Sequence, residues 1–163
     1  MWSIEMLSDS PTRLAAVREL VSEYVLLPDA WASRDGPPVS LPTFFESEIA
    51  ALPLPAQPPM GDIAMSVDDR QVFGAGLLVP FEKTAAELKR LYVKADLRGQ
   101  EAGRAIVVSL IDVAKELGYR SVVPDVMPSR TNAVELYRSL GFASARPFRH
   151  YDAREMLFFE LLL

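Results

Sequence analysis

Residues 87–105 read ELKRLYVKADLRGQEAGRA, and the spacing of the apolar residues changes within this stretch. In residues 87–93, charged and apolar side chains first alternate and are then followed by apolar side chains, which is typical of a strand. From Ala102 to Leu117 apolar residues recur at three- and four-residue steps, which predicts a helix that Gly118 ends as a left-handed cap. The stretch is therefore expected to run from a strand through a short loop into a long helix.

The loop between these two elements contains Gly99 and Gly103. Glycine lets the backbone approach a ligand closely, and the free N–H groups of the first helical turn attract an anion. Arg98 and Arg104 add positive charge that suits a pyrophosphate. The alternative is an ordinary strand–helix turn, with glycine for its geometry and arginine for solubility. The loop is neither a P-loop, which needs Gly-Lys-Ser/Thr, nor a dinucleotide fingerprint, which opens a βαβ unit.

Outward from this stretch, the pattern predicts alternating strands and helices. Further helices are expected from Pro11, with Ser10 as N-cap, to near Pro28, then around Phe44 to Leu52, and from Ala133 to Leu140. Further strands are expected at 4–7, 62–67, 71–79, 121–126, 142–145 and 156–162. Their order gives a mixed α/β sheet with one parallel strand–helix–strand step. The proline-rich segment 53–59 reads as a stiff surface loop, since neither side is long enough to fold alone. We expect residues 1–163 to form a single domain.

Composition excludes several classes of protein. With 22 acidic and 17 basic side chains the formal charge is −5, which argues against a general nucleic-acid binder. There is no cysteine and a single histidine, His150, so thiol chemistry and a multi-histidine metal site are excluded. No apolar run reaches the ~20 residues of a membrane span, and the N-terminus lacks the pattern of a secretory signal. We expect a cytoplasmic protein without metal, nucleic-acid or membrane partners.

Two segments in register carry a resemblance to a known family. The first combines Leu91-Tyr92-Val93, the loop Arg98-Gly99-x-x-x-Gly103-Arg104-Ala105, Ala114 and Leu117-Gly118-Tyr119. The second reads Ala133-Val134-x-Leu136-Tyr137-x-x-Leu140-Gly141-Phe142. Together they resemble the GCN5-related N-acetyltransferases, the GNAT family. The resemblance implies a mostly antiparallel mixed sheet with a central parallel strand–helix–strand crossover and flanking helices.

The resemblance also implies a reaction, in which acetyl-CoA gives its acetyl group to a primary amine, on a small molecule or a peptide, by direct attack. Tyr137 corresponds to the family's general acid, and Glu87 matches the position of a glutamate base. For Tyr137 the structural alternative is a ring packed on the sheet. For Glu87 it is a surface strand residue paired with Lys89 or Lys83. The implied acetyl-CoA contacts are the bulged strand and the loop: Leu91, Tyr92, Val93, Arg98, Gly99, Gln100, Glu101, Ala102, Gly103 and Arg104.

The sequence departs from the family pattern at two of these places. Glu101 stands where relatives commonly have a glycine, and its carboxylate lies close to the expected pyrophosphate. Arg130 stands where relatives often have an asparagine, seven residues before Tyr137, and we expect it to reach the nucleotide phosphate; Asn132 follows two residues later. Both departures favour a second hypothesis, a non-catalytic member of the same fold that binds acyl-CoA.

The acceptor site is expected to lie among the first two helices, the Ala30–Ser40 loop and the Phe148–Arg154 turn. Acidic residues lining it would favour a cationic amine, and the candidates are Glu46, Glu48, Asp68, Asp69 and Glu82. The apolar C-terminal segment Phe158–Leu163 suggests a homodimer in which this strand pairs across a two-fold axis.

Overall fold

The computed structural model of the chain describes residues 1–27, 43–69, 71–99, 101–151 and 155–163. Its strands are β1 (Trp2–Met6), β2 (Asp62–Asp68), β3 (Val72–Glu82), β4 (Ala85–Val93), β5 (Ser121–Val123), β6 (Asp125–Val126), β7 (Ala143–Ser144) and β8 (Leu157–Leu162). Its helices are α1 (Leu14–Leu26), α2 (Thr43–Ala51), α3 (Ala102–Glu116) and α4 (Thr131–Ser139), with 3-10 turns η1 (Pro11–Arg13) and η3 (Ala95–Leu97).

The strands form one mixed sheet in the order β1-β2-β3-β4-β5-β8-β6, with β7 paired to β8. Every neighbouring pair is antiparallel except β4 and β5, which run parallel and are joined by α3. The expected fold class, with its single parallel strand–helix–strand crossover, is confirmed. Gly118 follows α3 with a φ of +83°, as the sequence predicts for a left-handed helix cap.

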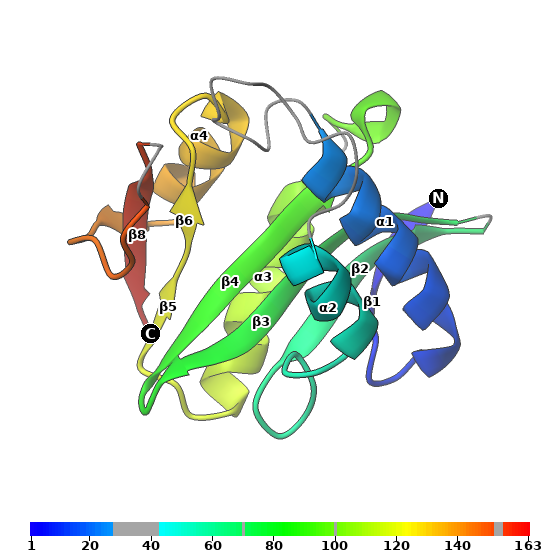
Figure 1. The fold of residues 1–163 in the computed structure, drawn as a ribbon, viewed down its shortest axis with the longest axis horizontal. Helices are drawn as coiled ribbons and strands as arrows, with labels where there is room; N and C mark the ends of the chain where they lie inside the picture. The colour runs from blue at the N-terminus through cyan, green and yellow to red at the C-terminus, as the bar shows by residue number, and fades with distance from the viewer. Residues whose placement is uncertain (28–42, 70, 100, 152–154) are drawn as a thin grey trace.

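Helices cover both faces of the sheet (Figure 1). Helices α1 and α2 lie on one face and pack on a core that includes Val17, Ile63 and Met65. Helix α3 lies on the opposite face, where Ile106 and Leu110 pack with α4 and the β8 residue Phe159 in a second core. Successive side chains of β2 and β3 point to opposite faces of the sheet and therefore pack alternately in the first and the second core. The sheet thus separates the two cores.

The parallel pair stays together for only three residues. Ala85–Glu87 pairs with Ser121–Val123, and beyond that point Pro124 interrupts the second strand. The chain resumes as β6, which pairs with β8 and not with β4. Proline lacks the N–H that a central strand would donate, so the break falls where no ladder bond to β4 is needed. From Pro124 onward the sheet is therefore split between β4 and β6.

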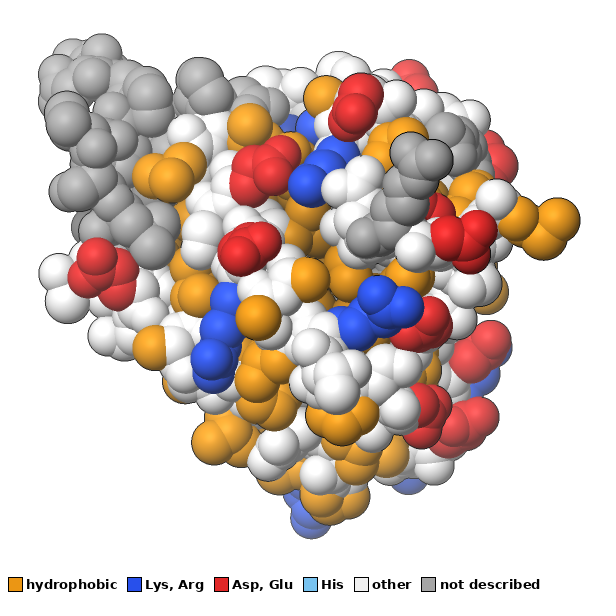
Figure 2. Space-filling model, turned by 90° about the vertical axis from the view of Figure 1, so that its right-hand side faces the viewer, with side chains coloured by type: hydrophobic (Ala, Val, Ile, Leu, Met, Phe, Trp, Pro, Cys, Tyr) orange, Lys and Arg blue, Asp and Glu red, His pale blue; other side chains and the backbone are white. Residues whose placement is uncertain are grey.

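Strand β8 pairs with β5 and β6 on one side and, at Phe159 and Glu160, with β7 on the other. The homodimer expected through this strand stays a prediction. Among the acidic candidates for the acceptor site, Glu48 has a side chain that is only 18% exposed and forms ion pairs with Lys89 and Arg90. On the face shown in Figure 2, acidic, basic and hydrophobic side chains intermix. No helix in the described part of the chain is both long enough and apolar enough to cross a membrane.

Candidate active site

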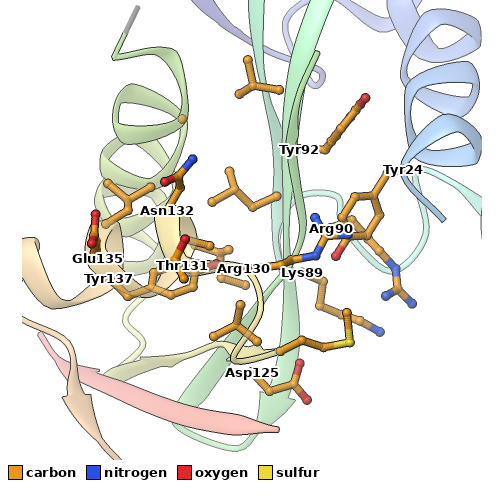
Figure 3. A pocket seen from close by; sticks show the side chains of 18 of the residues that line it. Tyr24, Lys89, Arg90, Tyr92, Asp125, Arg130, Thr131, Asn132, Glu135 and Tyr137 are labelled. Carbon is orange, nitrogen blue, oxygen red and sulfur yellow. The ribbon is translucent and has the colours of Figure 1, made fainter. Parts of the chain in front are cut away.

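A pocket of about 1100 Å³ opens where the sheet splits. Residues 88–93 of β4 form one wall, and residues 125–127, which include β6, form part of the other, continued by α4. The N-terminal turn of α3 lies at one end, and side chains from α1 and α2 lie at the other. Figure 3 shows the side chains that project into it from these elements. A concave site at the carboxyl end of a parallel strand is a common position for ligand binding.

A β-bulge shapes the β4 wall. Ala75 pairs with Tyr92 and Leu77 pairs with Lys89. Between these two pairs β3 has one residue and β4 has two. Arg90 and Leu91 therefore oppose a single residue, and Arg90 takes a φ of +54°. Because the bulge shifts the alternation by one, Lys89 and Arg90 both reach Glu48 on α2, while Leu91 and Val93 pack with the α3 core. Tyr92 turns to α1, where its hydroxyl donates a 2.6 Å hydrogen bond to Glu23.

The loop before α3 brings backbone amides and two arginines to the end of the pocket. The first helical bond runs from the Ala105 N–H to the Glu101 carbonyl (3.0 Å), so the amides of Ala102, Gly103 and Arg104 precede the helical ladder. Arg98 donates to the Val93 carbonyl (2.9 Å), and Arg104 donates to Ser139 on α4 (2.9 Å). The arginines thus link the loop to both walls and add charge beside an amide-lined helix end.

Glu101 caps α3 in an uncommon backbone conformation. Its φ of +61° and ψ of 5° are left-handed, and its side chain makes no capping hydrogen bond. A glycine adopts this conformation at little cost, whereas a residue with a Cβ is strained by about 1 kcal/mol. The carboxylate lines the same pocket as Arg98 and Arg104. Gln100, also expected to contact the cofactor, lies outside the described residues.

Tyr137 lines the pocket from α4 and is only 3% exposed. Its ring packs against Phe142 (5.3 Å between centroids) and Phe159 (6.0 Å), and its hydroxyl forms no hydrogen bond with the described residues. Burial raises the pKa of Tyr137 well above its ordinary value; the charges of Tyr24 and Asp125 add to this rise, and Arg130 opposes it. The hydroxyl is therefore protonated at neutral pH and able to donate its proton.

Glu87 lies beneath the other end of the pocket, with a side chain only 4% exposed. It is not paired with Lys89 or Lys83; both its oxygens accept from Arg149, at 2.7 and 3.0 Å. Arg149 also donates to Asp125 Oδ2 (3.1 Å), which accepts from the Tyr151 hydroxyl as well (2.5 Å). Hydrogen bonding to Glu87 raises the pKa of Arg149 further, so its charge is permanent. The cluster joins β4, β6 and the segment between β7 and β8.

Arg130 does not extend toward the loop before α3. Its guanidinium lies 4.7 Å from the centre of the Tyr24 ring, on α1 across the pocket (Figure 3). The tyrosine face attracts this cation. Asn132 lines the pocket from the first turn of α4. The Ala30–Ser40 loop and residues 152–154, expected at the acceptor site, lie outside the described residues.

The structure gathers the predicted residues at two ends of one pocket. Leu91, Tyr92, Val93, the described residues of the 98–104 loop, Arg130 and Tyr137 line it, whereas Glu87 supports it from behind Arg149. The sequence singled out none of Asp125, Arg149, Tyr151 and Tyr24 individually, although the last three lie in segments expected at the acceptor site, the first helix and the Phe148–Arg154 turn. A signal for Asp125 was available, since it follows Pro124, which interrupts a predicted strand. No local pattern marks Arg149 or Tyr151, because only the fold brings them beside Glu87.

Comparison with known proteins adds a family match. The profile of the acetyltransferase (GNAT) family matches residues 28–142. An uncharacterised N-acetyltransferase of Schizosaccharomyces pombe is 32% identical over 106 residues, which cover 64% of this chain and 65% of the yeast protein. An IAA acetyltransferase of Azospirillum brasilense is 30% identical over 81 residues, 49% of this chain and 53% of that protein. The matches thus span about two thirds or less of the length of these curated relatives.

Solved structures share the whole fold at low sequence identity. An acetyltransferase from Streptococcus agalactiae superposes with a TM-score of 0.77 at 17% identity, covering 99% of this chain and 98% of that one. A Salmonella typhimurium structure that contains acetyl-CoA superposes with a TM-score of 0.73 at 18% identity, covering 99% and 93%. At this level of identity the likeness supports the fold.

Proposed function

This chain belongs to the acetyltransferase (GNAT) family, and from that membership we propose that it transfers the acetyl group of acetyl-CoA to a primary amine. One observation carries the proposal: a single pocket joins an amide-lined helix end flanked by Arg98 and Arg104 to a buried, protonated tyrosine, Tyr137. The helix end and its arginines can bind a pyrophosphate. The tyrosine hydroxyl can protonate a departing thiolate.

For the cofactor we propose that the pyrophosphate binds the amides of residues 102–104, with Arg98 and Arg104 turning from Val93 and Ser139 toward it. The pantetheine arm then follows β4 past Val93, Tyr92 and Leu91, where the bulge interrupts the ladder with β3. A backbone N–H in such a bulge can donate to the thioester carbonyl, whose oxygen gains negative charge during attack. In this arrangement the side chains of Leu91 and Val93 pack against the core beneath α3, and the cofactor hydrogen-bonds to the backbone of these residues.

The chemical step balances without a covalent enzyme intermediate. The acceptor ammonium loses one proton, its nitrogen attacks the thioester carbon, and a carbon–nitrogen bond forms as the carbon–sulfur bond breaks. The nitrogen loses a second proton, and the departing sulfur takes one from the Tyr137 hydroxyl. One of the two protons lost by the nitrogen restores the Tyr137 hydroxyl through solvent, so the products are an acetamide and CoA thiol, with one net proton released.

A base must present an oxygen to the acceptor. Both oxygens of Glu87 accept from Arg149, whereas Asp125 lines the pocket and uses only Oδ2 in its bonds to Arg149 and Tyr151. We therefore assign proton removal to the cluster as a unit, with Asp125 as the carboxylate that meets the amine and Glu87 as the buried carboxylate that holds Arg149. This refines the expectation from the sequence, in which Glu87 itself is the base.

Two measurements test the proposal. Calorimetric titration should show acetyl-CoA binding at micromolar concentration. A thiol reagent should then detect CoA released upon adding an amine, with no background from the protein because the chain has no cysteine. Binding without any amine-dependent release would favour the non-catalytic acyl-CoA-binding alternative, and absence of binding up to millimolar acetyl-CoA would refute both.

A further inference from the structure

Glu48 on α2 contacts two consecutive residues at the β4 bulge. Its Oε2 lies 2.7 Å from Arg90, and its Oε1 lies 3.4 Å from Lys89 Nζ, so one oxygen faces each cation. Burial raises the pKa of the Glu48 carboxyl, but the positive charges of Arg90 and Lys89 outweigh burial and bring the pKa below its ordinary value. Glu48 is therefore an anion at neutral pH. Lys89 and Arg90 line the pocket, whereas Glu48 is not among the described residues that do so.

The backbone conformation at this place is a costly one. In a regular strand Lys89 and Arg90 would point to opposite faces of the sheet. Here both reach the same carboxylate, and Arg90 takes a left-handed φ of +54°. A residue with a Cβ is strained in this conformation, and such strain persists only where the surroundings hold it. Two like charges side by side also repel each other. Glu48 opposes both costs, because it attracts both side chains.

The two faces of the bulge are held by different means. On the α3 face, a Cβ at Gly76, the β3 residue opposite the bulge, would lie 2.8 Å from Ile106 and 3.6 Å from Leu91, so apolar side chains already fill this space. On the α2 face, the Arg90 guanidinium lies 4.8 Å from the centre of the Phe45 ring and ends in the ion pair described above. Apolar packing thus secures one bulge residue, and charge secures the other.

We propose that Glu48 is a positioning residue for acetyl transfer: through Lys89 and Arg90 it fixes the bulge whose backbone N–H meets the thioester carbonyl. This inference rests on the proposed function and adds to it a residue that contacts neither acetyl-CoA nor the acceptor. A backbone donor stabilises the developing oxyanion best when its position is fixed before the reaction. Loss of the Glu48 charge should therefore slow turnover more than it weakens the binding of acetyl-CoA, whose pyrophosphate binds at the other end of the pocket.

The first test is Glu48→Gln, which keeps the size of the side chain and removes its charge. We expect kcat to fall about tenfold, measured as CoA release with the primary amine that reacts fastest. Acetyl-CoA affinity, measured by calorimetry, should change less than about twofold. The matched control is Glu116→Gln, at the exposed last residue of α3, which should behave as the wild type. An unchanged kcat in Glu48→Gln would overturn the proposal.

The second test repeats this substitution in an Arg90→Gly background. Glycine adopts a left-handed φ with little strain, and without the arginine the repulsion is also lost. The charge of Glu48 then has no strained residue to hold, so the effect of Glu48→Gln on kcat should shrink from about tenfold to less than about twofold. A Glu48 that acted directly on the acceptor would keep its full effect in this background, and that result would overturn the positioning role.

A third measurement needs no turnover. In the unliganded protein, the NMR coupling between N–H and Hα of residue 90 reports its φ. Glu48→Gln should change this coupling and the amide shifts of Arg90 and Leu91, whereas Glu116→Gln should not. If no amine supports CoA release by the wild type, the proposed reaction fails, and the coupling still decides whether Glu48 holds the bulge. An unchanged coupling in Glu48→Gln would refute that role whatever the outcome for acetyl transfer.

Discussion

Arg149 donates two hydrogen bonds to Glu87, at 2.7 and 3.0 Å, and a third to Asp125 at 3.1 Å. One guanidinium thereby bridges β4 and β6 across the split in the sheet. Charge-assisted bonds of this kind fix geometry as well as contribute energy. Whether Glu87 removes the proton or only holds Arg149 can therefore be decided by comparing substitutions within the cluster.

The first prediction concerns that comparison. Asp125→Asn should lower kcat about 10²-fold, because the carboxylate that receives the proton is lost. Glu87→Gln keeps one acceptor oxygen for Arg149 and should lower kcat only about tenfold. Steady-state kinetics provide the measurement. A larger loss of kcat in Glu87→Gln than in Asp125→Asn would make Glu87 the base.

Tyr137→Phe tests the general acid. Removing the hydroxyl while keeping the ring should lower kcat about 10²-fold or more and leave KM nearly unchanged. The packing against Phe142 and Phe159 is retained, so the melting temperature should change little. The matched control is Tyr119→Phe, because Tyr119 is bonded to the Met60 carbonyl and lies outside the pocket. Full turnover in Tyr137→Phe would refute the assignment.

Arg98→Ala and Arg104→Ala test the pyrophosphate site. Each removes one charge-assisted contact, and we expect acetyl-CoA affinity to fall about tenfold for each. Arg120→Ala, at an exposed position immediately before β5, controls for a general change in net charge. Calorimetry with acetyl-CoA measures the effect. Unchanged affinity in both loop variants would place the cofactor elsewhere.

Two substitutions of Glu101 separate charge from backbone strain. Glu101→Gly relieves the left-handed φ and should raise the free energy of unfolding by up to about 1 kcal/mol. It also removes a negative charge beside the proposed pyrophosphate, so acetyl-CoA should bind several-fold more tightly. Glu101→Gln should reproduce the gain in affinity but not the gain in stability. Thermal unfolding and calorimetry distinguish the two, and weaker binding in both variants would contradict the proposed position of the pyrophosphate.

Tyr92→Phe should separate fold from binding. The variant loses the 2.6 Å bond to Glu23, and we expect a loss of about 1–2 kcal/mol in unfolding free energy. Acetyl-CoA affinity should stay unchanged, because the proposed cofactor contact uses only the Tyr92 backbone. Burial and the Glu23 carboxylate raise the pKa of Tyr92 to about 12. A raised pKa in the folded state stabilises the protein fully below the ordinary value near 10. The difference between wild type and variant should therefore shrink from pH 10 to pH 12, and a constant difference would contradict this account. Glu19→Gln, on the exposed side of α1, serves as the control.

Much of the fold follows from local pattern. The stripe in α3, its glycine cap and the strand–loop–helix order are all read from periodicity, because burial dictates that periodicity. The end of the pocket at residues 98–104 was predictable for the same reason, since its amides and arginines are contiguous in the chain. The strand expected at 121–126 contains Pro124, and the split in the sheet occurs at this proline.

The acceptor end was not predictable from local pattern. Glu87 was weighed against Lys89 and Lys83, its neighbours in sequence, yet its partner is Arg149, 62 residues away. The contact of Arg130 with Tyr24 was not foreseen either, since the entry into α4 and helix α1 are far apart in the sequence; its expected role at the nucleotide phosphate stays a prediction. The bulge turns Lys89 and Arg90 to the same face of the sheet and so breaks the alternation of side chains along β4. A prediction that assumes strict alternation therefore assigns the residues after the bulge to the wrong face.

The two cores on opposite faces of the sheet support different parts of the pocket. The core beneath α3 and α4 carries the loop and the tyrosine proposed for acetyl-CoA, while helices α1 and α2 of the other core carry Tyr24 and Glu48. If the proposed reaction holds, substitutions in α1 and α2 other than at Glu48 should change the acceptor without disturbing the proposed cofactor site. Acceptor choice in this scaffold would then be open to evolution and to redesign independently of its chemistry.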